Sequence, residues 1–295
     1  MGRGFRDASP AARAVFAEAD DALSFDLSKL MFEGPESDLA LTANTQPAVL
    51  TASVAAAAAC AERGLVPALG AGHSLGEWSA LVVAGALEFR DAVRLVRRRG
   101  EFMQDAVPVG TGAMAAVMGL DLAAVEAVCG EAAQGQVVDV ANINSAGQIV
   151  VAGARAAVER AVALAATRGG RKSVMLPVSA PFHSALMAPA AERLAAELAS
   201  VTVKDPRIPV ARNVDAGLTR TATDVKPFLL RQVASPVRWT DCMQRLASEG
   251  ATSFVEVGPG RVLTALVKRV VEGARGMSIE DPDGLERVLA QGTGA

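Results

Sequence analysis

Residues 66–87 read VPALGAGHSLGEWSALVVAGAL, with the motif GHSLG of Gly72–Gly76 at the centre of the stretch. The segment before the motif is typical of a short strand, and the apolar segment after it is typical of a helix. A strand that turns directly into a helix leaves little room for side chains, and a glycine on each side of Ser74 meets that restriction. The stretch therefore predicts an α/β fold in which Ser74 is strained and exposed at a helix N-terminus.

A serine in this position can act as a nucleophile. The first backbone N–H groups of a helix are unpaired, and with the helix dipole they can stabilise an oxyanion, for which the Leu75 N–H is the expected donor. The alternative is an ordinary turn whose serine caps the helix, because a GxSxG pattern often arises by chance. The strand and helix on either side of Ser74 favour the nucleophile.

A nucleophilic serine needs a general base, and histidine is the usual one. The chain has two histidines. His73 precedes the nucleophile and is expected to point away from it, which leaves His183 as the base. A single histidine is more often structural than catalytic, but the lack of another base favours His183. No acidic residue stands out as a third member, and a backbone carbonyl could orient the imidazole instead.

One arginine is predicted to point into the protein. On a helical wheel of residues 88–106, Arg99 falls within the apolar arc, whereas the other arginines of this helix fall outside it. A buried arginine keeps its charge and needs an anionic partner, either a structural Asp or Glu or the carboxylate of a substrate. Gln46, before a proline at an expected helix start, is a second polar candidate, with helix capping as the alternative.

The middle of the chain predicts a separate small domain. Residues 112–178 show a strand, a helix, two strands joined by a turn at 144–147, a second helix and a last strand, which is the order of a ferredoxin-like unit. We therefore expect this domain to be inserted into a larger α/β domain of residues 1–111 and 179–295. The tail after Gly273 is polar and is expected to be loose.

Composition excludes several classes of protein. Lys and Arg number 29 against 32 Asp and Glu without a long run of like charge, so nucleic-acid binding has no support. Cys60, Cys129 and Cys242 lack CxxC spacing, which argues against a disulfide framework or a zinc site and favours a reducing cytoplasm. The N-terminus does not read as a secretory signal, and no apolar run is predicted to span a membrane.

Several motifs together carry a family resemblance. In order along the chain they are Thr45–Ala48, Gly72–Glu77, Arg99–Gly100, Asn142–Ser145 and Glu256–Gly260. In order and spacing they resemble the malonyl-CoA:acyl carrier protein transacylases of bacterial fatty-acid synthesis, over nearly the whole chain. The resemblance implies an α/β-hydrolase-like large domain with a parallel sheet, the ferredoxin-like insert and no metal or external cofactor.

The resemblance also implies an activity and its catalytic residues. A malonyl group would pass from coenzyme A to Ser74 and then to the phosphopantetheine thiol of an acyl carrier protein, in a ping-pong reaction. Ser74 would be the nucleophile and His183 the base, with the imidazole oriented by the backbone carbonyl of Gln232. This implication agrees with the absence of an evident acidic member.

Other residues follow from the resemblance as parts of the substrate pocket. Arg99 would pair with the malonyl carboxylate, Gln46 would form a polar wall, and Asn144 would belong to the part of the pocket in the small domain. Phe182 resembles the phenylalanine that malonyl-selective acyltransferase domains carry at this place, where methylmalonyl-selective ones tend to have serine.

The N-terminus departs from the family pattern. The family begins with an apolar strand and a Gly-Gln-Gly-Ser-Gln loop that supplies a second oxyanion N–H, and neither precedes Met1-Gly2 in this sequence. We therefore expect the 295-residue chain to be a shortened reading of a longer protein and to be poorly active as written.

Two rival functions remain open. A hydrolase or thioesterase could use the same Ser74 and His183, with water as acceptor. A catalytically impaired remnant could bind the carrier protein without turnover.

Arg261, Lys268 and Arg269 share one predicted helix face and are either a basic docking site for an acidic carrier protein or an ordinary solvated face.

Overall fold

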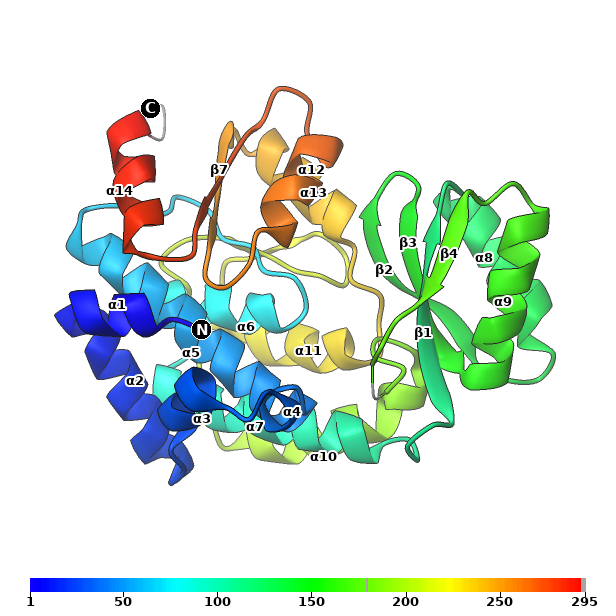
Figure 1. Ribbon diagram of the computed structural model, residues 1–295, viewed down its shortest axis with the longest axis horizontal. Helices are drawn as coiled ribbons and strands as arrows, with labels where there is room; N and C mark the ends of the chain where they lie inside the picture. Colours follow the sequence, from blue (N-terminus) through cyan, green and yellow to red (C-terminus); the bar gives the residue numbers. More distant parts are fainter. Residues whose placement is uncertain (179, 293–295) are drawn as a thin grey trace.

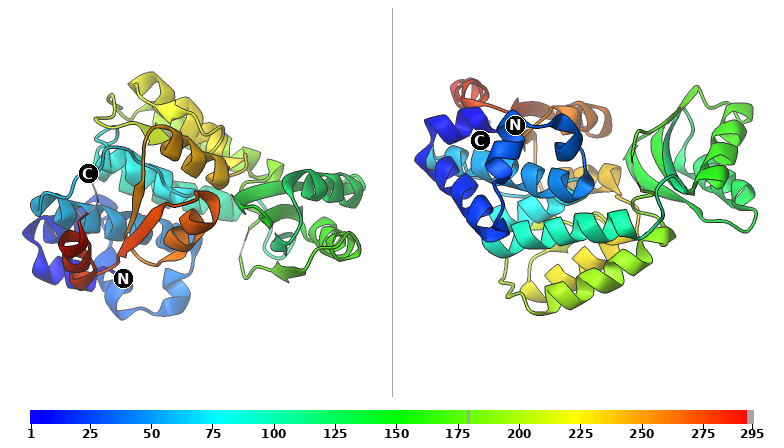
Figure 2. Two further views of the ribbon diagram at one scale, coloured as in Figure 1. Left: turned by 90° about the horizontal axis from the view of Figure 1, so that it is seen from above. Right: turned by 60° about the horizontal axis from the view of Figure 1, so that its bottom comes forward.

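Helices dominate the larger part of the molecule, and a four-stranded sheet with two helices stands at one end of it (Figure 1). The computed structural model describes residues 1–178 and 180–292, so Ser179, the expected start of the second half of the large domain, lies outside the described residues. Both views in Figure 2 keep the sheet apart from the helices of the larger part. Among the described residues, no helix is long and apolar enough to cross a lipid bilayer.

The larger part is built from two segments of the chain. The first contains α1 (Arg3–Ala8), α2 (Pro10–Leu23), α3 (Leu27–Glu33), α4 (Glu36–Leu39), α5 (Thr42–Glu62), α6 (Leu75–Val83) and α7 (Phe89–Asp105). The second contains η1 (Ala185–Met187), α10 (Ala188–Ala199), β5 (Val210–Ala211), β6 (Leu218–Thr219), α11 (Ala222–Val233), α12 (Trp239–Ser248), β7 (Ser253–Val257), α13 (Val262–Val270), β8 (Arg275–Ile279) and α14 (Pro282–Gln291).

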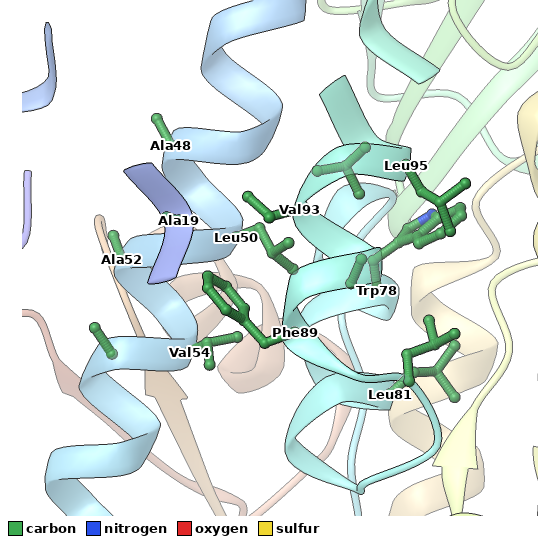
Figure 3. Close-up of a cluster of buried hydrophobic side chains, with 14 of the residues drawn as sticks. Ala19, Ala48, Leu50, Ala52, Val54, Trp78, Leu81, Phe89, Val93 and Leu95 are labelled. Atoms are coloured by element: carbon green, nitrogen blue, oxygen red, sulfur yellow. The ribbon is translucent and has the colours of Figure 1, made fainter. Parts of the chain in front are cut away.

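The core of the larger part forms around the alanine-rich helix α5. Leu50 and Val54 of α5 are directed toward Val93 and Phe89 of α7, and all four side chains are buried (Figure 3). Small side chains let the helices approach closely. At Gly100 of α7, a Cβ atom would lie 2.7 Å from the Cα of Ala43 and from the carbonyl oxygen of Thr42 in α5. This close crossing brings residues 99 and 46 together.

The smaller part has a simple sheet. Its elements are β1 (Gly112–Met118), α8 (Leu122–Ala133), β2 (Val138–Ser145), β3 (Gln148–Ala154), α9 (Arg155–Thr167) and β4 (Lys172–Met175). The strands lie in the order β2-β3-β1-β4, and every neighbouring pair is antiparallel. Helices α8 and α9 pack on one face of the sheet with their own apolar cluster, while Met114, Ala141, Val150 and Ala152 form a second cluster on other positions of the strands.

Three expected elements differ in the structure. Residues 66–70 form no strand, because the ladder pairing there is limited to one parallel bridge between Gly70 and Val210. Helix α5 begins at Thr42, before the expected start, and contains Pro47 inside its first turns. The tail after Gly273 is ordered as β8 and α14, since β8 pairs in parallel with β7 and both elements contribute buried apolar side chains, namely Met277, Ile279, Leu285 and Val288.

Candidate active site

The backbone at Ser74 is strained. Its φ of 52° and ψ of −109° lie in a region that residues other than glycine rarely adopt. A Cβ at Gly72 would lie 1.8 Å from the carbonyl carbon of Gly76, so only glycine fits there, whereas a Cβ at Gly76 would meet no atom within 4 Å. The expected lack of room therefore applies to Gly72 and not to Gly76. Leu75 opens α6, and its N–H is among the first-turn groups without a helical acceptor.

Ser74 and His183 are in direct contact. The Ser74 Oγ lies 2.7 Å from the His183 Nε2, and the His183 Nδ1 lies 2.9 Å from the backbone oxygen of Gln232. Because a carbonyl oxygen only accepts, the proton belongs on Nδ1, and Nε2 is free to accept the serine hydroxyl proton. His183 is buried, and burial, followed by the nearby Arg99 charge, lowers its pKa to about 3. The imidazole is therefore neutral at physiological pH and able to act as a base.

Arg99 points from α7 to the nucleophile and is only 2% exposed. Its Nη2 donates to the Ser74 Oγ at 3.2 Å and to the Gln232 Oε1 at 3.1 Å, and its Nη1 donates to the Gln46 Oε1 at 2.6 Å. Its Nε has no hydrogen-bond partner among the residues that the structure describes. Within the described part of the chain, no Asp or Glu forms an ion pair with Arg99, so the structural ion pair that the sequence left open is not seen there.

Gln46 is brought to the same place from α5. It is buried, its amide nitrogen donates to the Thr42 Oγ1 at 3.0 Å, and its amide oxygen faces Arg99. Because α5 begins at Thr42, Gln46 lies within the helix rather than in a capping loop. Two neutral amide oxygens, from Gln46 and Gln232, thus surround the guanidinium of Arg99.

Asn144 and Phe182 approach the site from the side of the small sheet. The Asn144 Oδ1 lies 2.9 Å from the Nε2 of His73, whose ring also packs against Trp239 at 5.6 Å. His73 therefore turns away from the nucleophile, toward β2. Phe182 is half-buried and packs against the core of the larger part as well as against the cluster around Met114 on the small sheet.

The roles of two further polar residues at the site were not predicted from the sequence. Asn213 is fully buried, accepts from the Ser74 N–H at 2.7 Å and donates to the Gly72 oxygen at 2.8 Å, which holds the turn on both sides. Glu77 is also buried, three residues after the serine. In the sequence Glu77 was named only as the last residue of the motif Gly72–Glu77, and Asn213 has no signal, because its segment is distant in the chain.

The arrangement supports acyl transfer through a serine ester. A neutral histidine contacts the hydroxyl, a helix N-terminus lies beside it, and a cation is positioned where it can select an acyl group with a carboxylate. In the described part of the chain, no group of three or more His, Cys, Asp or Glu side chains is placed to hold a metal ion.

Comparison with known proteins agrees with this chemistry. An acyl transferase domain family matches residues 1–283. The malonyl CoA-acyl carrier protein transacylase of Escherichia coli K12 is 48% identical over 281 residues, which cover 95% of this chain and 91% of that protein. The transacylase of the same name from Bacillus subtilis 168 is 46% identical over 290 residues, 98% of this chain and 92% of that protein.

Solved structures are similar over the same length. An acyl carrier protein S-malonyltransferase from Vibrio cholerae superposes with a TM-score of 0.95 at 45% identity, covering 97% of this chain and 94% of that one. A malonyl-transacylase solved in complex with a type II PKS acyl-carrier protein has a TM-score of 0.96 at 44% identity, with 99% and 95% covered.

Proposed function

Because the chain belongs to the acyl transferase family, and within it to the malonyl CoA-acyl carrier protein transacylases, we propose that it moves a malonyl group from coenzyme A to the phosphopantetheine thiol of an acyl carrier protein. The observation that carries this function is the convergence on one atom. The Ser74 Oγ lies 2.7 Å from the base His183 and 3.2 Å from the Arg99 guanidinium.

The reaction proceeds in two half-reactions. In the first, the Ser74 Oγ attacks the thioester carbonyl while His183 takes its proton, and the Leu75 N–H stabilises the oxyanion. The carbon–sulfur bond then breaks, His183 protonates the departing thiolate of coenzyme A, and malonyl-Ser74 remains. In the second, the carrier thiol attacks the ester as His183 takes its proton, and the same proton returns to the Ser74 oxygen. The balance needs no external cofactor.

Selection of malonyl rests on Arg99. A carboxylate in the pocket would meet a buried guanidinium that carries full charge, because burial lowers the Arg99 pKa only to about 10. The Nε of this guanidinium has no partner within residues 1–178 and 180–292. Charge-assisted pairs of this kind are strong and directional. Gln46 forms the polar wall beside the arginine, while Asn144 and Phe182 line the pocket toward the small sheet.

The finer fold description is part of the same proposal. The order β1-α8-β2-β3-α9-β4 and the sheet order β2-β3-β1-β4 support a ferredoxin-like domain at residues 112–178. The sharp turn at Ser74 before α6 supports an α/β-hydrolase-like domain for residues 1–111 and 179–295. The cytoplasm, where acyl carrier proteins and coenzyme A thioesters would be available, is the proposed location.

The direct test follows both half-reactions. Purified protein is incubated with malonyl-CoA, with and without phosphopantetheinylated carrier protein, and the products are separated by chromatography. We expect malonyl carrier protein and free coenzyme A in equal amounts when the carrier is present. Release of free malonate at the same rate with and without carrier would instead identify a hydrolase, and binding of the carrier without any product would identify a remnant.

The pH dependence of loading should be unusual for a histidine base. The neutral imidazole is the active form. A folded-state pKa of about 3 keeps the imidazole neutral at pH values far below 6.5, which is the ordinary pKa of histidine. At saturating malonyl-CoA, we expect kcat for loading of Ser74 to stay level from about pH 8 down to about pH 5. A rapid-quench pH series checks this. A fall in kcat with a midpoint near the ordinary histidine pKa would show that the pKa of His183 is not lowered by its surroundings.

Docking of the carrier protein is expected at the basic end of α13. Lys268 and Arg269 form no ion pair with any described residue, whereas Arg261 is already paired with Glu280. Arg269 also donates to Gln148 of the small sheet, and α13 lies beside that sheet (Figure 1).

Reversing the two unpaired charges, Lys268→Glu with Arg269→Glu, should raise the KM for carrier protein by about tenfold and leave loading from malonyl-CoA unchanged. Steady-state kinetics with each substrate varied in turn would measure both effects. Arg261→Glu is the matched control, and it should raise the KM for carrier protein less, because the Arg261 charge is already paired with Glu280. A change in the rate of loading from malonyl-CoA would show that Lys268 and Arg269 do not act in docking of the carrier protein.

A further inference from the structure

Glu77 is a buried carboxyl group to which the reaction steps above assign no part. It lies in the first turn of α6 and is 2% exposed. Its Oε2 accepts from the backbone N–H of Asn213 at 3.0 Å and from the Nε2 of Gln232 at 2.7 Å. Asn213 in turn is hydrogen-bonded to the backbone of the serine turn, and Gln232 also bonds to the backbone of Ser74. Glu77 is therefore hydrogen-bonded to the two residues whose side chains hold the backbone of the nucleophile.

Gln232 is hydrogen-bonded to Ser74, His183, Arg99 and Glu77. It is fully buried, its backbone oxygen accepts from the base His183, and its Nε2 donates to the backbone oxygen of Ser74 at 3.0 Å as well as to Glu77. Its Oε1 accepts from Arg99 at 3.1 Å. A carboxylate can only accept and a guanidinium can only donate, so the two charges at its ends determine which way this amide points.

The same contacts decide how Arg99 is neutralised. A buried guanidinium without any counter-charge is very costly, and an arginine in direct contact with a buried carboxylate would have its binding directions occupied. Here the charge of Glu77 acts on Arg99, but the amide of Gln232 stands between the two groups. Arg99 therefore has a counter-charge nearby while its hydrogen bonds go to neutral oxygens, and no described residue bonds to its Nε.

We propose that Glu77 is a positioning residue for substrate selection. It accepts from the Gln232 amide nitrogen and so orients the Gln232 amide oxygen toward Arg99, and its negative charge weakens the attraction between Arg99 and the malonyl carboxylate. This inference rests on the proposed malonyl transfer. A malonyl carboxylate that pairs with Arg99 would be a second negative charge near the same guanidinium, and the charge of Glu77 would repel it. Glu77 thus limits how tightly malonyl is held before it moves on to the carrier.

Burial raises the Glu77 pKa to about 7, against the hydrogen bonds from Asn213 and Gln232 and the Arg99 charge, which lower it, so the carboxyl carries its full charge only above neutral pH. The charges that act on Glu77 are those of Arg99 from α7 and Arg212 after β5. Glu77 in turn acts on the buried thiol of Cys242, and His183 is affected by Arg99 and His73. Arg212 also pairs with Asp215, so Arg99 is the cation that responds most directly to the loss of the Glu77 charge.

The test separates charge from shape with two variants. Glu77→Gln keeps an oxygen that can accept from both donors but removes the charge, and Glu77→Ala removes both. Loading of Ser74 is measured by rapid quench with malonyl-CoA and with acetyl-CoA. Glu88→Gln, which removes one exposed charge at the start of α7, is the matched control and should behave as wild type.

For Glu77→Gln we expect kcat with acetyl-CoA within about twofold of wild type, a lower KM for malonyl-CoA, and a malonyl-to-acetyl ratio of kcat/KM raised by about tenfold. Glu77→Ala should lower kcat with both substrates by at least about tenfold, because Gln232 loses its anchor. A wild-type ratio in Glu77→Gln would overturn the inference, as would equal losses with both substrates in Glu77→Gln. If the wild type loads acetyl but not malonyl, the proposed function fails instead, and the inference falls with it.

Discussion

Replacing Ser74 with alanine should abolish covalent loading by malonyl-CoA, and replacing His183 with alanine should slow it by roughly 10⁴-fold or more. The first change removes the atom that we propose is acylated, and the second removes the one side chain among the described residues that is placed to take its proton, at 2.7 Å. Loading is measured as protein-bound label after rapid quench.

Ser79→Ala is the matched control for the serine variant. Ser79 lies on the same helix α6 and is buried, and its Oγ has no hydrogen-bond partner in the described part of the chain, so its loss should leave loading unchanged. Retention of covalent loading in Ser74→Ala would place the nucleophile elsewhere. Loss of loading in Ser79→Ala to the same extent would show that the assay reports the integrity of the helix and not the chemistry.

Replacing Arg99 with alanine should reduce malonyl loading far more than acetyl loading. Only malonyl presents a carboxylate to the guanidinium, and the loss of a buried, charge-assisted pair costs about 3 to 5 kcal/mol, or roughly 10²- to 10³-fold. The measurement is kcat/KM for both thioesters. Arg98→Ala is the control, since its side chain is half-exposed on the same helix and pairs with Glu101.

Equal losses with malonyl and acetyl in Arg99→Ala would contradict a role in substrate selection. That result would assign Arg99 to the packing of α5 against α7, where Gly100 already requires close contact with residues 42 and 43. A difference confined to malonyl supports the carboxylate clamp. Because lysine cannot reproduce the planar fork of a guanidinium, Arg99→Lys should recover only part of the malonyl activity.

Local patterns predicted much of the candidate catalytic centre. The GxSxG turn with its following helix predicted Ser74 as the nucleophile, and the presence of only two histidines left His183 as the expected base. The structure places these side chains in contact although 109 residues separate them. The helical wheel placed Arg99 on the buried side of α7, and it is buried there. The family inferred from the motifs is confirmed by the comparisons.

The remainder of the site depends on contacts that no local pattern encodes. Asn213 and Gln232 come from segments far from the serine, and their amides are polar side chains of a kind found on any surface. The sequence pattern also gave a wrong prediction where strand pairing determines the structure. The tail after Gly273 was expected to be loose because it is polar, but β8 is ordered by its parallel pairing with β7. Residues 66–70 have the composition of a strand and only one bridge.

Mapping the acyl group on the wild-type protein tests the proposed transfer most directly. The protein is incubated with malonyl-CoA, quenched in acid, digested and analysed by mass spectrometry, and a second sample receives carrier protein before the quench. We expect one malonyl group on the peptide that contains Ser74, and its quantitative passage to the carrier in the second sample. A malonyl group on any other residue, or a Ser74 ester that the carrier does not discharge, would contradict the proposal.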